Sequence, residues 1–386
     1  MGGASASPVR LVLVGGGHAH LHLLSEWARR PMSGVEIVLV SPSAQQWYSG
    51  MVPGYLAGVY EADELRIDLA GLARCAGAKL VVAAAEGVSV ADRVLVAGGE
   101  RIPFDLCSLD VGSGMAGAEI PGVREHAVTL RPMERAAQLR EQVDSLVARG
   151  GRPGSIAVVG AGAGGMEVAF ALAARLERSH GLGRVTIVDG ASDVLAGEAP
   201  RMRRRAAALL RERGIGLVLG RSVTRVEAGG LTLASGATVP ADLIVWATGA
   251  APPALLATSD LPRDDTGYLL VDRTLRAVGG LPVWGAGDCV TIATRRRLAR
   301  SGVQAVREGP VLLHNLRAAL GSGRARRFHA RDASLALLST SDGRALARRG
   351  RFQGYSRWAW WLKERIDRRF VARFAVACDE KAVPAG

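Results

Sequence analysis

Lysine is nearly absent from this chain. Lys79, Lys363 and Lys381 are the only lysines, so arginine supplies almost all of the positive charge behind the net charge of +13. Arginine in place of lysine, together with abundant alanine, is what codon bias produces. A nucleic-acid-binding surface would also carry a known motif, and the sequence contains none. We therefore do not expect the protein to bind nucleic acid.

The cysteines are few and far apart. No CxxC pair occurs among Cys75, Cys107, Cys289 and Cys378. This spacing argues against a zinc ribbon and against a local redox disulfide. We expect single buried thiols in a reducing cytoplasm.

A metal site is also not expected. His18, His20 and His22 alternate where a helix is expected to begin, so they do not share one helical face, and no cysteine or acid completes a ligand set. Packing, or contact with a phosphate, accounts better for these histidines.

Long hydrophobic runs are missing. No apolar stretch reaches the roughly 18 residues that would span a bilayer, and the N-terminal MGGASASPVR lacks the apolar core of a signal peptide. We expect a soluble cytoplasmic protein, or one bound peripherally at the inner face of the cell membrane. The 386 residues suit two or three domains, and 49 glycines suit nucleotide-binding turns.

One pattern occurs twice in the chain. An aliphatic run ends in glycines at 10–17 (RLVLVGGG) and again at 155–165 (SIAVVGAGAGG). Each copy continues into an alanine- and leucine-rich helical stretch and then a second aliphatic strand, at 36–41 and 184–189. Strand, helix and strand joined by a tight glycine turn form a βαβ unit with parallel strands. The sequence therefore predicts an α/β fold with two Rossmann-like units.

The repetition extends further. Short alternating strands follow at 94–106 and 231–243, and each copy ends in a small-residue turn, at 108–114 and 244–250. The last strand of the first unit returns only at 281–288, which predicts that the second unit is inserted within the first.

The C-terminal tail has a different pattern. Residues from about 330 predict two antiparallel strands around a turn at 341–343, followed by an amphipathic helix over 355–375. Such a stripe usually packs on its own domain or on a dimer partner, although tryptophan and arginine also suit a membrane surface. The predicted stripe consists of Trp358, Trp361, Leu362, Ile366, Phe370 and Phe374.

The second glycine motif is the stronger one. Gly160, Gly162 and Gly165 follow a strand and open a helix, as the GxGxxG fingerprint requires. The glycines permit a tight turn, close approach of a pyrophosphate and close packing of helix on strand. Asp189 ends the next strand, where a carboxylate accepts hydrogen bonds from ribose hydroxyls and repels a 2′-phosphate. We therefore expect NAD(H) rather than NADP(H).

The first motif is less regular. Gly15 and Gly17 are followed by His20 in the third glycine position, and the next strand ends in Ser41 rather than an acid. A late Gly-Ala-Gly-Asp segment ending in Asp288 supports this motif, because an aspartate there can hydrogen-bond a flavin ribityl hydroxyl.

Together these segments resemble the FAD-dependent pyridine nucleotide oxidoreductases, and within them the type II NADH dehydrogenase-like flavoproteins. Four segments are similar to the subgroup fused to, or encoded beside, selenophosphate synthetase: VGGGHAHLHLL, YSGMVPGYLAG, GVQAVREGP and LKERIDRRF. The resemblance implies an FAD-binding domain at 8–125 and 250–330, an NAD(P)H-binding domain at 126–249, and a C-terminal region at 331–386. It also implies hydride transfer from the nicotinamide to the flavin.

The resemblance also implies roles for individual residues. Glu167 would lie near the nicotinamide, unless it only complements the helix dipole. Tyr48, in a turn with Ser49, Gly50 and Met51, would lie near the flavin ring, and these two are the candidate catalytic residues. NAD(H) would bind Gly160, Gly162, Gly165 and Asp189. FAD would contact Gly15, Gly17, His20, Ser41, Ser113, Gly114 and Asp288.

The electron acceptor is not determined by the residues. The glutamine pair of related quinone-reducing enzymes is replaced by Gly302–Glu308, which weakens the case for a quinone, and no cysteine pair supports disulfide chemistry. A quinone is still the leading hypothesis. The alternatives are a redox protein of selenium or sulfur metabolism that partners selenophosphate synthetase, and a non-catalytic flavin- or NAD-binding sensor.

Overall fold

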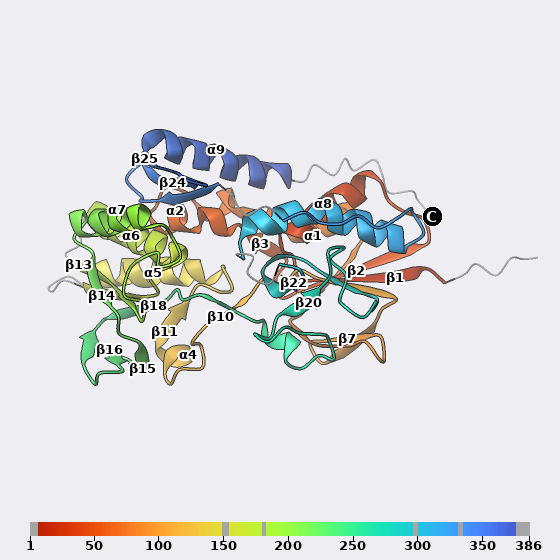
Figure 1. Cartoon of the computed structure of the whole chain (residues 1–386), viewed down its shortest axis with the longest axis horizontal. Coiled ribbons are helices and arrows are strands. Elements are labelled where there is room, and N and C mark those ends of the chain that lie inside the picture. The colour runs from red at the N-terminus through yellow and green to blue at the C-terminus, as the bar shows by residue number, and fades with distance from the viewer. Residues whose placement is uncertain (1–6, 149–153, 180–182, 296–299, 331–334, 376–386) are drawn as a thin grey trace, which may run out of the picture.

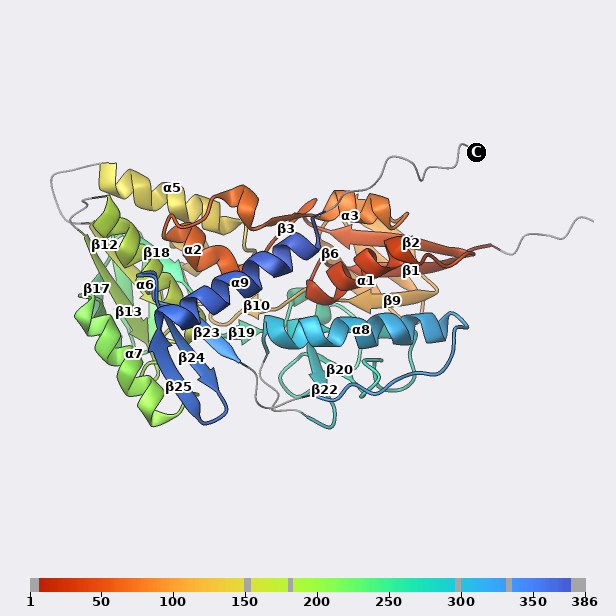
Figure 2. The ribbon, with the colours of Figure 1, turned by 90° about the horizontal axis from the view of Figure 1, so that it is seen from above.

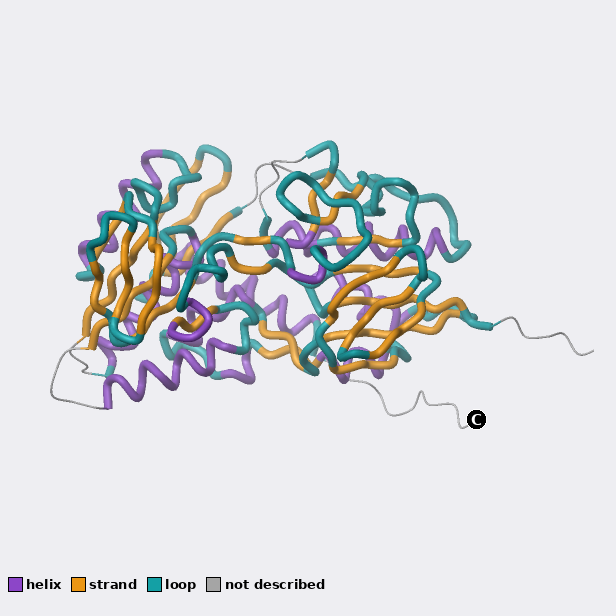
Figure 3. The backbone as a smooth tube through the Cα atoms, turned by 90° about the horizontal axis from the view of Figure 1, so that it is seen from below, coloured by secondary structure: helices purple, strands orange, loops and turns teal. Residues whose placement is uncertain are grey.

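The computed structural model describes residues 7–148, 154–179, 183–295, 300–330 and 335–375. Two α/β units lie side by side, and the C-terminal segment lies over both of them (Figure 1). Seen from below, most of the strands form two groups, one in each unit (Figure 3).

The first unit is built on a five-stranded parallel sheet in the order β21-β9-β1-β2-β5. The strand expected to return late, β21, does pair with β9 at the edge of this sheet. Its strands and helices are β1 (Val9–Val14), β2 (Val35–Ser41), β5 (Lys79–Val82), β9 (Leu106–Leu109), β21 (Val283–Gly285), α1 (His18–Arg29), α3 (Leu69–Cys75) and α8 (Gly302–Ala319).

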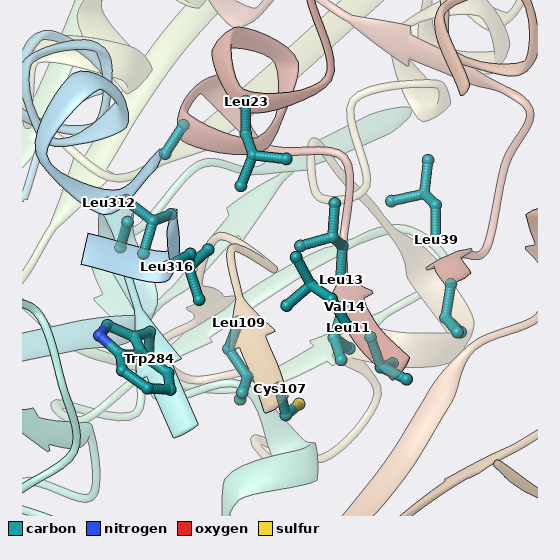
Figure 4. Packing of buried hydrophobic residues seen from close by; sticks show 14 of the residues in the cluster. Leu11, Leu13, Val14, Leu23, Leu39, Cys107, Leu109, Trp284, Leu312 and Leu316 are labelled. Atoms are coloured by element: carbon teal, nitrogen blue, oxygen red, sulfur yellow. The ribbon is translucent and has the colours of Figure 1, made fainter. Parts of the chain in front are cut away.

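Aliphatic side chains of β1 form the centre of this unit's core. Leu11 and Leu13 are fully buried and pack with Leu23 of α1 and Leu312 and Leu316 of α8 (Figure 4). A strand that is covered in this way is apolar throughout rather than alternating. This explains why a continuous aliphatic run before the glycines predicted a strand correctly.

The second unit repeats the plan with the sheet order β11-β18-β12-β13-β14, again parallel. Its elements are β11 (Ala127–Thr129), β12 (Gly154–Val159), β13 (Gly183–Asp189), β14 (Gly216–Leu219), β18 (Leu243–Trp246), α5 (Arg135–Ala148), α6 (Ala163–Arg178) and α7 (Pro200–Glu212). All five strands of this sheet come from one segment of the chain, residues 127–246.

Smaller sheets and short helices complete the two units. The antiparallel sheets are β6 (Ala85–Ser89), β7 (Val94–Ala97) and β8 (Glu100–Pro103), and β15 (Val223–Glu227), β16 (Gly230–Leu233) and β17 (Thr238–Pro240). The two-stranded sheets pair β3 (Gln45–Trp47) with β4 (Arg66–Asp68), β10 (Gly114–Met115) with β19 (Ala250–Ala251), and β20 (Leu269–Val271) with β22 (Val290–Ile292). The short helices are η1 (Ser49–Met51), α2 (Val52–Leu56), η2 (Ala62–Glu64), α4 (Val123–His126), η3 (Ala254–Leu256) and η4 (Gly287–Cys289).

The C-terminal region contains a three-stranded antiparallel sheet and one long helix. The strands β23 (Ala336–Ser339) and β24 (Ala345–Arg349) confirm the predicted hairpin, and β25 (Phe352–Ser356) is a third strand that the sequence did not predict. The helix α9 (Arg357–Arg373) crosses above the molecule from the second unit toward the first (Figure 2).

The predicted apolar stripe of α9 is only partly buried, because Phe374 is 2% exposed and Phe370 packs against the core of the first unit, whereas other members face solvent. Trp358, Trp361 and Ile366 are 66, 49 and 44% exposed, whereas Asp367 is 5% exposed. The expectation that the stripe packs on its own domain is therefore wrong for these three side chains. The inward face also carries charge, because Lys363 and Asp367 form an ion pair there and bond to Gly50 and Tyr48 of the surface beneath.

Three of the four cysteines lie among the described residues. Cys107 and Cys289 are free buried thiols as predicted, but Cys75 is disulfide-bonded, and Cys378 lies outside the described residues. None of the described helices has the length and apolarity needed to cross a membrane.

Candidate functional site

The first glycine turn connects β1 to α1 and is packed tightly against β9. Gly15 has a φ of +89° and faces the backbone carbonyl of Asp110, directly after β9. Gly17 donates its backbone N–H to that carbonyl oxygen at 3.1 Å. A Cβ atom at Gly17 would overlap the Asp110 carboxyl group, so glycine is required here by a protein side chain.

Asp110 also caps α1. Its Oδ2 accepts the backbone N–H groups of Ala19 at 2.7 Å and His20 at 3.0 Å. These groups belong to the first turn of the helix and have no partner within it. Burial raises the pKa of Asp110 to about 7, although the two N–H bonds oppose the shift. The sequence analysis did not single out Asp110.

His20 is fully buried behind the same turn. Its Nδ1 lies 2.7 Å from the Gly15 carbonyl oxygen and its Nε2 lies 2.8 Å from Ser108 Oγ. Burial lowers the pKa of His20 to about 4, so the ring is neutral at physiological pH. Both ring nitrogens therefore bind protein atoms, which favours the packing role over phosphate contact. Ser41 ends β2 and is buried.

Two side chains that were expected to contact FAD, Ser113 and Asp288, have polar atoms without a hydrogen-bond partner among the described residues. These atoms, Ser113 Oγ and Asp288 Oδ1, are both buried. Arg131 connects them, because it donates to the carbonyl oxygens of Ser113 and Gly114 and its charge lowers the pKa of Asp288, which burial raises. Unpaired buried polar atoms are costly, so their presence fits a bound group with hydroxyl and phosphate oxygens, as FAD has.

The second glycine turn connects β12 to α6 and has a different environment. Gly160 has a φ of +121°, and a Cβ atom at Gly165 would overlap the Gly160 carbonyl oxygen. A Cβ atom at Gly162 would meet no atom of the described structure within 4 Å. Gly162 is the N-cap of α6 and no side chain caps the helix there. The N-terminus of α6 is thus open to an anion.

Asp189 lies beside this turn at the end of β13. Its carboxylate accepts the backbone N–H of Ala161 at 2.5 Å and that of Ala191 at 2.7 Å. The acid is therefore fixed at the edge of the glycine turn, where the ribose of a dinucleotide would lie.

Both predicted catalytic residues lie beneath α9. Tyr48 donates its hydroxyl proton to Asp367 Oδ1 at 2.9 Å, and its ring stacks on Phe370 with 4.5 Å between centroids. Lys363 donates to Asp367 Oδ2 at 2.7 Å and to the Gly50 carbonyl oxygen at 2.7 Å. Burial and the charge of Asp367 raise the pKa of Tyr48.

Glu167 of α6 reaches the same place from the second unit. Its Oε1 accepts the backbone N–H of Ser339 at 2.7 Å. Burial raises the pKa of Glu167 to about 7, and the charge of Lys363 opposes that shift. We call Tyr48, Glu167, Lys363 and Asp367 the polar cluster.

The structure places Tyr48 and Glu167 beneath α9, and it adds Lys363 and Asp367, which the sequence did not reveal. Lys363 is a charged residue outside the predicted apolar stripe of α9, yet its side chain is only 12% exposed. Its four-residue spacing to Asp367 was a usable signal for an ion pair, although not for its direction. Among the described residues, no group of three or more His, Cys, Asp and Glu side chains could hold a metal ion.

Comparison with known proteins places this geometry in context. The family model described as pyridine nucleotide-disulphide oxidoreductase matches residues 9–309. An NADH dehydrogenase-like protein of Mycobacterium tuberculosis is 28% identical over 296 residues, which is 72% of each chain. A demethylphylloquinone reductase of Synechocystis is 28% identical over 194 residues, 50% of this chain and 47% of that protein, so the match spans about half of that relative.

Solved structures show the same fold. NDH2 of Plasmodium falciparum, determined with NADH, superposes with a TM-score of 0.81 at 13% identity, over 95% of this chain and 97% of that one. The sulfide:quinone oxidoreductase of Aquifex aeolicus superposes with a TM-score of 0.77 at 16% identity, over 95 and 91% of the two chains.

Proposed function

The chain belongs to the pyridine nucleotide-disulphide oxidoreductase family of FAD-dependent NAD(P)H oxidoreductases, and from this premise we propose that it oxidises NADH and reduces a quinone at a membrane surface. FAD, when bound, accepts a hydride from the nicotinamide and passes on two electrons. The observation that carries the proposal is the polar cluster, which joins both nucleotide-binding units beneath α9.

NADH is assigned to the second unit. The open N-terminus of α6 favours a pyrophosphate, and Asp189 stands where it accepts ribose hydroxyls and repels a 2′-phosphate. FAD is assigned to the first unit, where Gly15, Gly17, Ser113, Gly114 and Asp288 surround the turn. The domain boundaries proposed from the sequence, 8–125 with 250–330 and then 126–249, follow these two assignments.

The polar cluster supplies a protonatable group. Reduction of a quinone to a quinol consumes two protons along with two electrons. Glu167, with a pKa of about 7, holds a proton on its carboxyl group in part of the molecules at neutral pH. Lys363 stays charged, because Glu167 and Asp367 raise its pKa against the effect of burial. We assign Glu167 as the proton donor and Tyr48 as the residue that positions the flavin side of the cluster.

The outer face of α9 supports a membrane location. Trp358, Trp361 and Ile366 are exposed, and Phe352 of the preceding strand β25 is 84% exposed. Exposed aromatic residues interspersed with arginines are typical of helices that lie in the plane of a membrane interface. The inner face of the same helix contacts Tyr48, so a lipid-soluble acceptor would enter close to the flavin. This arrangement favours a quinone despite the absence of the glutamine pair.

The direct test follows the visible spectrum of the purified protein anaerobically. We expect flavin bands that bleach when NADH is added and recover when a soluble quinone analogue is added. Bleaching without recovery would contradict the quinone proposal and favour a selenium- or sulfur-containing acceptor. A yellow protein that NADH does not bleach would favour the sensor alternative.

The pH profile of the second half-reaction tests Glu167. Its carboxyl group is protonated below pH 7, so quinone-dependent reoxidation should slow as pH rises through 7, by up to about tenfold per pH unit. In Glu167→Gln this pH dependence should disappear and the rate should be low throughout. Glu177→Gln, an exposed acid at the far end of the same helix, is the matched control. An unchanged profile in Glu167→Gln would contradict the assignment.

A further inference from the structure

The two glycine turns of this chain differ in whether an acidic side chain lies next to them. At the second turn, the position that follows β18 is Ala247, and the helix N-terminus of α6 has no side-chain cap. At the first turn, the position that follows β9 is Asp110, whose carboxylate caps α1 from within the protein. An anion therefore already sits at the helix N-terminus where the pyrophosphate of FAD is expected.

The carboxyl group of Asp110 lies between the two turns of the flavin site. Oδ2 accepts both N–H bonds from α1. Oδ1 faces Gly17 and Gly287, because a Cβ atom on either glycine would collide with it. Glycine is thus required at positions 17 and 287 because a side chain at either position would collide with the Asp110 carboxyl group.

Other acids surround Asp110 on the remaining sides. Asp288 follows Gly287 in the η4 turn, and Glu308 of α8 accepts the backbone N–H of Gly287 at 2.6 Å. Asp110 and Glu308 are each 2% exposed. Asp110 also acts on the buried thiol of Cys289, whose pKa is raised by burial and by the charge of Asp110, whereas His20 reaches Asp110 through its backbone N–H and its ring bonds to Gly15 and Ser108. Among these acids, the dipole of α1 and its two N–H groups compensate the negative charge of one carboxylate.

A pyrophosphate would bring more negative charge to the same turn. Like charges at close range in a buried site favour the protonated form of a carboxyl group. We propose that Asp110 takes up a proton when FAD binds, so that flavin affinity in this protein is linked to pH. The proton is placed on Oδ1, since Oδ2 is occupied by the N–H groups of Ala19 and His20.

The direction of the pH dependence follows from the pKa of Asp110 in the FAD-free and in the FAD-bound protein. Burial has already raised the pKa of Asp110 to about 7 without flavin, and a bound pyrophosphate raises it further. A group whose pKa is higher in the bound state favours binding fully at pH below its free-state pKa, and this advantage is lost as pH rises from there through the bound-state pKa. FAD should therefore bind most tightly below pH 7 and dissociate more readily above it.

The experiment uses the full-length holoprotein. Serial dilution between pH 6 and pH 9 releases FAD, and the fluorescence of the free flavin gives the dissociation constant. We expect this constant to rise by up to about tenfold for each pH unit above 7. In weakly buffered solution at pH 8, an indicator dye should report about one proton released per FAD released.

Variants identify the group. Asp110→Asn keeps an oxygen that can accept both N–H bonds, and its dissociation constant should vary by less than about twofold over the same range. Asp105→Asn is the matched control, because Asp105 accepts the Arg10 N–H at 2.7 Å at the opposite, exposed end of β9. It should behave as the natural protein does.

Three results would overturn the inference. A natural protein that releases no proton with FAD excludes it, whatever the variants do. If the dissociation constant of FAD still depends steeply on pH in Asp110→Asn, Asp110 is not the group that takes up the proton. If the pH dependence is kept in Asp110→Asn but disappears in Glu308→Gln, the proton is assigned to Glu308. The inference rests on FAD occupying the first unit. A protein that never binds FAD would contradict that assignment itself, whereas pH-independent binding contradicts only the role of Asp110.

Discussion

In the first unit the N-terminus of α1 is capped by a buried carboxyl group, whereas in the second unit the N-terminus of α6 is open. The glycines in the two turns consequently have different purposes. Gly17 makes room for Asp110, and Gly162 leaves empty space. Two similar glycine motifs therefore have different local structures. The residue that distinguishes them, Asp110, lies some 90 positions along the chain from the first turn.

The largest expected effect concerns the cluster that joins the two units. Lys363→Met removes the buried cation and leaves the Asp367 carboxylate without its ion-pair partner. We expect the free energy of unfolding to fall by about 3–5 kcal/mol, measured by denaturant titration. Arg365→Met, an exposed cation on the same helix, should change it by less than about 0.5 kcal/mol. Equal effects of the two variants would show that the cluster does not hold the units together.

Alanine substitutions at equivalent glycines test whether the two turns differ as described. In Gly17→Ala the new methyl group collides with Asp110, which should destabilise the protein by about 1–3 kcal/mol and release FAD. In Gly162→Ala the methyl group enters open space, so the thermal midpoint should hold while NADH binding weakens. Thermal unfolding, flavin content and NADH titration measure the three quantities. If both variants lost flavin alike, the turns would not differ as described.

A smaller effect would sharpen the assignment of the second unit. Asp189→Ala removes the acceptor expected for the ribose hydroxyls, and we expect the KM for NADH to rise about tenfold, which is about 1.4 kcal/mol. FAD content should not change, because Asp189 lies in the other unit. An unchanged KM for NADH would reject this role for Asp189.

The smallest effect on stability separates the two faces of α9. Trp361→Ser replaces an exposed side chain, so the free energy of unfolding should change by less than about 0.5 kcal/mol. Binding to vesicles of anionic phospholipid should nevertheless weaken several-fold, as measured by co-sedimentation. Retention of full vesicle binding by the double variant with Trp358→Ser would argue against this face as the membrane contact.

Much of the fold was predictable because its signals are local. Aliphatic runs that end in glycine identified β1 and β12, the turn at 341–343 identified the hairpin, and helical periodicity identified α9. The late strand β21 was found because the same pattern occurs twice and one strand was missing from the first copy.

The site was less predictable where its chemistry depends on what lies opposite. The inward face of α9 could not be inferred from its own sequence, since a stripe of tryptophans suggests burial and Lys363 suggests solvent. The role of Asp110 depends on β9 lying beside β1. Periodicity along one element carries no information about such neighbours.

The order of the strands has a consequence for biosynthesis. The ribosome completes every strand of the second sheet by residue 246, whereas the edge strand β21 of the first sheet emerges only with residues 283–285. Until then β9 presents an unpaired parallel edge to the crowded surroundings of a nascent chain. We expect the inserted unit to fold first on the ribosome, and chains that end prematurely between these points to depend on chaperones for their solubility.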